Sequence, residues 1–101
     1  MIQEIVIQHV QPDKRDEYIQ VFGEFLTKAN YTGSHGIKFL ASIEDPGRVI
    51  LLVEWDSVET HTRIRDTPTY NAMRELTGKY QTAKSDGGHF ILHEVKPNSS
   101  S

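Results

Sequence analysis

Residues 48–56 carry apolar side chains on both faces of a predicted strand, and this feature restricts most strongly what the chain can fold into. The two alternating sets are Val49, Leu51, Val53 and Trp55 on one face, and Ile50 and Leu52 on the other. Because a strand with one wet face alternates apolar with polar residues, we expect this strand to be covered on both sides. It ends on Trp55, the only tryptophan, which either closes a core or forms a pocket wall.

Periodicity and turn signals predict three further strands and three helices around this run. We expect strands over residues 2–10, 37–44 and 89–95, and helices over residues 12–29, 57–65 and 68–80. Asp-Pro-Gly at residues 45–47 predicts a hairpin turn. Asp56, followed three residues later by Glu59, has the spacing of a capping box for the short helix. Thr67 and Pro68 supply the cap and the first position of the last helix.

The resulting order, β-α-β-β-α-α-β, predicts a ferredoxin-like α+β domain with an antiparallel sheet. All helices then lie on one face of the sheet, yet apolar residues also fall on the other. We assign to this uncovered face Val6, Val10, Ile50, Leu52, Phe90 and Leu92. A second copy of the sheet is the simplest cover, so we expect a homodimer of one domain, residues 1–96, with a flexible tail over residues 97–101.

Composition excludes several classes of function. The net charge of −3 argues against a nucleic-acid partner, which usually meets a basic face. Apolar runs are too short for a membrane span, and the N-terminal residues lack the features of a secretory signal. The chain has no cysteine, which removes disulfides, thiolate nucleophiles and zinc–thiolate sites and is compatible with a cytoplasmic protein.

Three segments resemble the antibiotic biosynthesis monooxygenase (ABM) family. DPGRVILLVEWDSVETH at residues 45–61 resembles its strand–helix segment, RIRDTPTYNAMREL at residues 63–76 its following helix, and GGHFILHEV at residues 87–95 its closing strand. The likeness covers residues 2–95. It implies a dimeric α/β barrel, in which two sheets meet and each subunit keeps a pocket between its own sheet and helices.

Some members of that family oxidise polycyclic phenols to quinones with oxygen and without a metal or flavin. Their pockets hold an asparagine four residues before the tryptophan, an aromatic hydroxyl six residues after it, and an arginine on the last helix. By this resemblance Trp55 and Arg74 match, whereas Leu51 replaces the asparagine and His61 the hydroxyl. Haem-cleaving members have a second tryptophan and a histidine where this chain has Ile64 and Arg74, so haem is not an expected substrate.

The residue types support the same candidates. His61 falls on the inner side of the short helix, and histidine is the usual general base near neutral pH. Arg74 lies four residues after Tyr70 on the inward stripe of its helix, where a fixed cation can stabilise a substrate anion. We therefore expect His61 and Arg74 to be catalytic, and the substrate to be bound by Trp55, Leu51, Tyr70 and Met73.

Each candidate also has a plainer interpretation: a core tryptophan, a structural histidine and an arginine paired with an acid. The predicted function is a cofactor-independent monooxygenase for a small hydrophobic aromatic or carbonyl substrate. The alternatives are a non-catalytic or regulatory binding module and an isomerase on the same fold. A solvent-lined cavity bounded by the three candidates favours an enzyme, whereas a dry interior favours the module. No metal site is expected, because His89 and His93 on one strand face lie roughly 13 Å apart.

Overall fold

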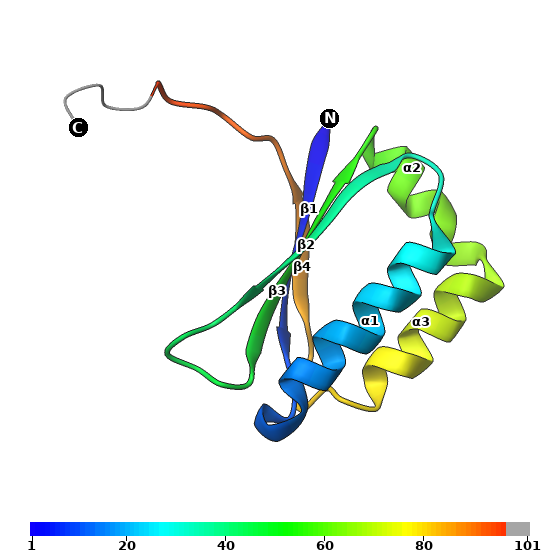
Figure 1. Ribbon diagram of the computed structural model, residues 1–101. Helices are drawn as coiled ribbons and strands as arrows, with labels where there is room; N and C mark the ends of the chain where they lie inside the picture. The colour runs from blue at the N-terminus through cyan, green and yellow to red at the C-terminus, as the bar shows by residue number, and fades with distance from the viewer. Residues whose placement is uncertain (97–101) are drawn as a thin grey trace.

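Four strands form one antiparallel sheet, and the helices pack together on one face of it (Figure 1). The structure is a computed structural model and describes residues 1–96, so the predicted tail over residues 97–101 lies outside the described residues. β1 (Ile2–His9) and β3 (Arg48–Trp55) are central, with β2 (Ser34–Ala41) at one edge and β4 (Asp86–Phe90) at the other. The order β2-β3-β1-β4 confirms the predicted ferredoxin-like α+β fold.

The helical layer consists of three α-helices and two single turns of 3-10 helix. They are η1 (Pro12–Lys14), α1 (Arg15–Ala29), α2 (Val58–Arg63), η2 (Ile64–Asp66) and α3 (Pro68–Gly78). α1 and α3 lie side by side across the sheet, and α2 lies near the end of β3 (Figure 1). α1 buries Tyr18, Phe22 and Leu26, which repeat every four residues and so face the sheet together.

The pairing of β1 with β3 decides which apolar set faces the helices. Val6 stands opposite Leu51, so both lie on the helix-covered face, and Val10 is 1% exposed within the core. Our assignment of Val6 and Val10 to the uncovered face is therefore wrong. Because β1 is apolar on both faces, alternation alone could not tell the two faces apart. The uncovered face instead carries two opposed pairs, Ile5 with Leu52 and Ile7 with Ile50.

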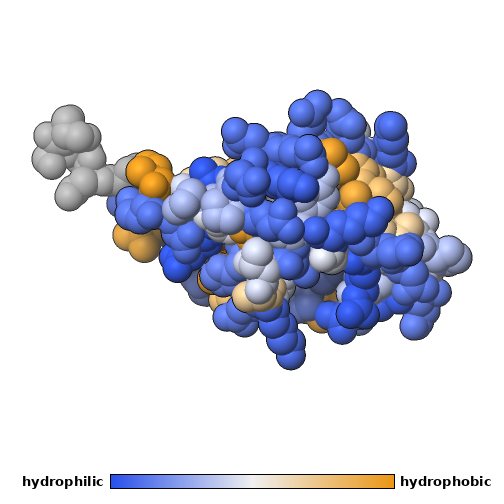
Figure 2. Space-filling model, turned by 90° about the horizontal axis from the view of Figure 1, so that it is seen from below, coloured by the Kyte–Doolittle hydropathy of each residue, from blue (hydrophilic) through white to orange (hydrophobic). Residues whose placement is uncertain are grey.

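β4 begins and ends earlier than expected. Gly87 and Gly88, which precede the strand predicted over residues 89–95, pair with Val6 and Ile5 of β1, because an edge strand needs only its backbone to join the ladder. Leu92, predicted on the uncovered face, lies beyond the strand and is 65% exposed. Residues 91–96 leave the sheet (Figure 1), and Figure 2 shows apolar surface gathered where they leave the body of the protein.

The loop between α1 and β2 is fixed against the start of α2. Gly33 has a φ of 89° and a Cβ there would lie 2.1 Å from Thr60 Cγ2, so only glycine fits. Its carbonyl accepts a hydrogen bond from the backbone N–H of Asp56, 2.9 Å away. The cap of α2 is Ser57, whose Oγ accepts from Thr60 N–H at 3.1 Å, so the predicted capping box on Asp56 is wrong by one residue. The cap predicted for α3 is confirmed.

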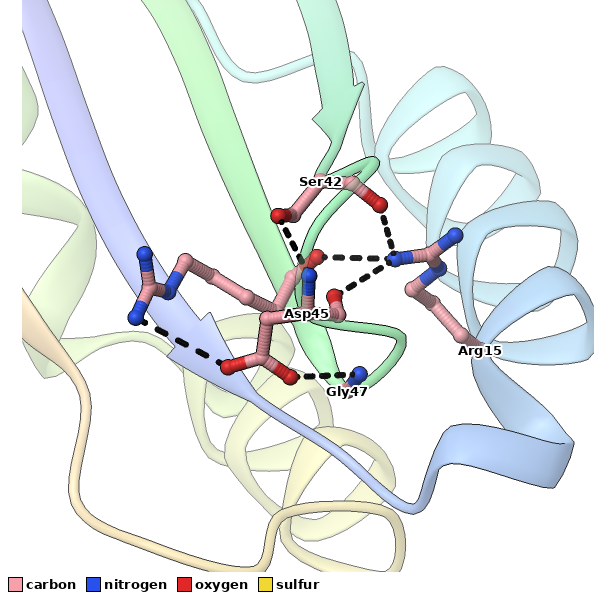
Figure 3. Close-up of polar contacts among 5 residues, drawn as sticks. Arg15, Ser42, Asp45 and Gly47 are labelled. Atoms are coloured by element: carbon pink, nitrogen blue, oxygen red, sulfur yellow. Dashed lines mark hydrogen bonds and ion pairs between the residues drawn. The ribbon is translucent and has the colours of Figure 1, made fainter.

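Arg15 ties the start of α1 to the hairpin between β2 and β3 (Figure 3). Its Nη1 donates to the carbonyl oxygens of Ser42, Asp45 and Arg48 at 2.8, 3.1 and 3.2 Å. Within the turn, Asp45 Oδ1 accepts from the Gly47 N–H at 3.0 Å. One cation therefore joins three carbonyl groups of the hairpin, two of which, those of Asp45 and Arg48, also accept backbone N–H groups within it.

Arg15→Ala should lower the free energy of unfolding by about 1–3 kcal/mol, because hydrogen bonds from charged donors contribute more than neutral ones. Arg48→Ala is the matched control. Its guanidinium lies 3.7 Å from the Asp45 carboxylate in an exposed ion pair, so its loss should change stability by less than about 1 kcal/mol. Urea denaturation of both variants measures the difference, and equal effects would contradict the role given to Arg15.

Candidate active site

A cavity of about 590 Å³ lies between the sheet and the helices. Its walls come from β1, β3, α1, α3, the α2–η2 segment and the loop after α3. It brings together all six side chains expected from the sequence: Leu51, Trp55, His61, Tyr70, Met73 and Arg74. Its volume falls within the range of small-molecule sites, and a mixed apolar and polar lining is typical of them.

Trp55 forms one wall of the cavity and is only 2% exposed. Its ring stacks on the His61 imidazole with centroids 4.7 Å apart and planes inclined by 21°. Its Nε1–H donates to Glu4 Oε1 at 2.9 Å. Glu4 stands opposite Val53 in the β1–β3 ladder, so its side chain reaches Trp55 along the diagonal of the same sheet face.

His61 is buried and has both ring nitrogens engaged by protein groups. Its Nε2 lies 3.3 Å from Glu4 Oε2, and its Nδ1 lies 2.6 Å from His89 Nε2. His89 stands opposite Glu4 in the β1–β4 ladder, so strand register places all these groups together. We call the row Trp55–Glu4–His61–His89 the Glu4 network.

Burial shifts the pKa values of the two central groups of the Glu4 network, Glu4 and His61, in opposite directions. Burial raises the pKa of Glu4, although the Trp55 N–H and the positive fields of His89 and Arg65 partly offset this. Burial, followed by repulsion from His89 and Arg65, lowers the pKa of His61 to about 4. At neutral pH His61 is therefore an uncharged hydrogen-bonding group, and Glu4 is a better proton acceptor than an ordinary exposed carboxylate.

Glu4 was not among the residues predicted from the sequence, although its position on the first strand could have identified it. Glu4 and Gln8 occupy core-facing positions of β1, in alternation with Ile2, Val6 and Val10. A charged residue on a buried strand face requires partners, so Glu4 could have been named as a candidate. The partners themselves come from β3, α2 and β4 and could not be read from the sequence.

Tyr31 lines the cavity and has a hydroxyl without a hydrogen-bond partner in the described residues. Its ring centroid lies 6.3 Å from that of Trp55. Its phenolic oxygen is buried and has no hydrogen-bond partner within residues 1–96. Burial, and then the neighbouring Tyr70 phenol, raise the pKa of Tyr31, so the group stays protonated and can donate a hydrogen bond to a ligand oxygen.

Three cations also line the cavity, and we call them the cationic rim: Arg65 of η2, Arg74 of α3 and Lys84 of the following loop. All three residues are exposed. Within the described part of the chain, none of them lies within 4.0 Å of a carboxylate. Arg74 is therefore not held in a structural ion pair there, and its charge can meet a ligand.

No three histidine, aspartate or glutamate side chains of residues 1–96 form a group that could hold a metal ion. None of the helices in this part of the chain has the length and apolar character needed to cross a membrane.

Residues 1–76 match the sequence pattern of the family described as Antibiotic biosynthesis monooxygenase (ABM), and the chain belongs to this family. No curated protein matches it by sequence. A solved structure from Bordetella bronchiseptica, named as an antibiotic biosynthesis monooxygenase, is 27% identical with a TM-score of 0.81, over 93% of this chain and 96% of that chain.

Two further structures share the fold at lower identity. One from Caulobacter crescentus is 21% identical with a TM-score of 0.77, over 92% of this chain and 90% of that chain. SnoaB from Streptomyces nogalater, named as a cofactor-independent oxygenase, is 14% identical with a TM-score of 0.75, over 96% of this chain and 97% of that chain.

His61 should remain uncharged down to about pH 4, and NMR titration of its ring carbons in wild type and in His61→Asn, which identifies the signal, measures this. Because an unfolded histidine takes up a proton near pH 6.5, the free energy of unfolding should fall as pH drops from about 6.5 to 4, by up to about 3 kcal/mol. The raised pKa of Glu4 acts in the opposite sense, since the folded state then keeps its proton to higher pH. Titration of the His61 ring near pH 6.5 would contradict the buried network.

Proposed function

We propose that this protein is a cofactor-independent monooxygenase acting on a flat, hydrophobic phenol or carbonyl compound in the cytoplasm. One observation carries the proposal: a largely buried carboxylate, Glu4, whose side chain is 15% exposed, lines a cavity of about 590 Å³ beside a tryptophan. An open cavity bounded by Trp55, His61 and Arg74 favours an enzyme over a binding module with a packed interior. Membership of the ABM family also favours an enzyme over a binding module.

In this mechanism the proton acceptor is Glu4. Both ring nitrogens of His61 lie against protein groups, Nε2 at 3.3 Å from Glu4 Oε2 and Nδ1 at 2.6 Å from His89 Nε2, so neither is free to take a substrate proton. His61 then acts as a positioning residue that holds Glu4 and, with Trp55, forms the stacking surface for a flat ring. This revises our expectation that His61 itself removes the proton.

Glu4 removes a proton from a substrate CH₂ that is made acidic by a carbonyl or phenol in the same ring system. The resulting carbanion, spread over the rings, transfers electrons to O₂, and a carbon–oxygen bond forms to give a peroxide anion. This anion takes back the proton to become a hydroperoxide. Loss of the second hydrogen of the carbon together with the outer OH breaks the O–O bond, releases water and leaves a carbonyl: R₂CH₂ + O₂ → R₂C=O + H₂O. The substrate supplies all the electrons, while the positive charge of Arg74 stabilises the anionic substrate.

Glu4→Gln should lower kcat for oxygen consumption by roughly 10²–10⁴-fold, because the amide can still accept the Trp55 N–H but cannot take a proton. Anthrone, a flat molecule with an acidic CH₂, is the test substrate, measured with an oxygen electrode and by quinone absorbance. Glu54→Gln on the opposite face of the sheet is the matched control and should keep full activity. A folded Glu4→Gln variant with wild-type turnover would refute the mechanism, and product formed without oxygen would favour the isomerase.

We also propose that the protein acts as a homodimer joined through the uncovered face of the sheet. Four half-buried aliphatic side chains from β1 and β3 lie there: Ile5, Ile7, Ile50 and Leu52. The adjoining segment exposes Ile91 and Leu92, at 69% and 65%. A second copy offers the same apolar surface, so two sheets can cover each other.

Analytical ultracentrifugation at low micromolar concentration should give about 23 kDa, twice the chain mass of 11.5 kDa. Leu52→Asp should shift the protein towards monomer and lower its melting temperature, because assembly and stability are linked. Val58→Asp is the control: Val58 is 38% exposed on α2, in the helical layer, so this variant should remain a dimer. A stable wild-type monomer would contradict the proposal.

A further inference from the structure

We infer that the cavity takes an aromatic carboxylate, with the carboxylate at the cationic rim and an oxygen on its ring system hydrogen-bonded to Tyr31. This inference rests on the proposed function, because it concerns the same cavity. It names the chemical class of the substrate that this cavity takes. The cationic rim and the Tyr31 hydroxyl are independent observations, and each is a polar group with no protein partner in the described residues.

The charge around the cavity opposes that of the whole protein. The chain has a net charge of −3, yet three cations line this one cavity. The one acid that lines it, Glu4, already accepts from Trp55 and lies against His61. The cations come from η2, α3 and the loop after it, so the fold gathers them from separate segments. Such a group gives the mouth of the cavity a local positive potential that attracts an anion.

The three cations are not equivalent. Arg65 is near enough to Glu4 and His61 for its charge to affect the pKa of both. A carboxylate bound beside Arg65 alone would also meet the negative charge of Glu4. Arg74 and Lys84 lie on α3 and on the loop that follows α3, and we assign the substrate carboxylate to these two residues.

Tyr31 marks where an uncharged oxygen of the ligand would lie. Its hydroxyl is the one buried side-chain polar atom in residues 1–96 that has no hydrogen-bond partner. Leaving such a group unpaired is unfavourable, so an acceptor at this position would stabilise the complex. Because Tyr31 lies beside Trp55, a ring stacked on the indole can present a phenol or carbonyl oxygen to it.

The experiment compares 6-hydroxy-2-naphthoate with its uncharged methyl ester, which has nearly the same shape. Calorimetric titration of wild type should give roughly tenfold tighter binding of the acid at 50 mM NaCl, and less than about threefold at 500 mM, because salt screens exposed charges. Lys84→Gln and Arg74→Gln should each lower this preference by about threefold or more. Lys79→Gln, an exposed lysine outside the cavity lining, should leave it unchanged.

Tyr31→Phe separates the two parts of the inference. It removes only the hydroxyl, so it should weaken the acid and the ester by the same factor and leave their ratio unchanged. Equal wild-type affinity for acid and ester, no binding of either, or a preference that survives both Lys84→Gln and Arg74→Gln would overturn the inference.

These outcomes differ from a failure of the proposed function. Neither naphthalene compound has an acidic CH₂, so the titrations report binding without turnover. A protein that selects the acid but consumes no oxygen with anthrone keeps the carboxylate site and loses the monooxygenase proposal. A protein that consumes oxygen but does not distinguish acid from ester loses only the carboxylate site.

Discussion

The largely buried carboxylate of Glu4 is the group around which the candidate site is organised. A carboxylate in an apolar interior is unfavourable unless it is hydrogen-bonded, and Glu4 accepts a hydrogen bond from Trp55 Nε1–H and lies 3.3 Å from His61 Nε2. These contacts fix the indole at the end of β3 and the imidazole on α2.

Further along β1, a second polar side chain in the interior also has a hydrogen-bond partner. Gln8 is buried on the same strand face as Glu4, and its Oε1 accepts from the hydroxyl of Tyr18 at 2.9 Å. Two polar residues thus lie where an ordinary core strand would be apolar. The Gln8 pair connects β1 to α1, and both Gln8 and Glu4 line the cavity. Of the two, only the carboxylate can take up a proton, so the proposed chemical role falls to Glu4.

Much of the fold could be predicted, because local patterns decide it. The two apolar faces of β3, the Asp-Pro-Gly turn and the Thr67–Pro68 start of α3 each act over a few residues, and together they give the element order. Boundaries were less certain where two glycines form an edge strand by pairing with β1. The assignment of Val6 to a face failed because β1 is apolar on both sides, and only its register with β3 separates them.

For the candidate site, the sequence by itself identified six side chains that line one cavity, because strand and helix periodicity places them on inward faces. The sequence also places a charged residue, Glu4, among the apolar residues of one strand face, and this pattern could have identified Glu4 as a candidate. Only the tertiary structure decided that Glu4 meets Trp55 and His61, that His89 completes the row, and that Tyr31 has an unpaired hydroxyl. These groups lie on separate elements of the fold. Hydrogen bonds between them depend on atomic positions within a few tenths of an ångström. Strand register and helix packing set these positions, and spacing along the chain does not.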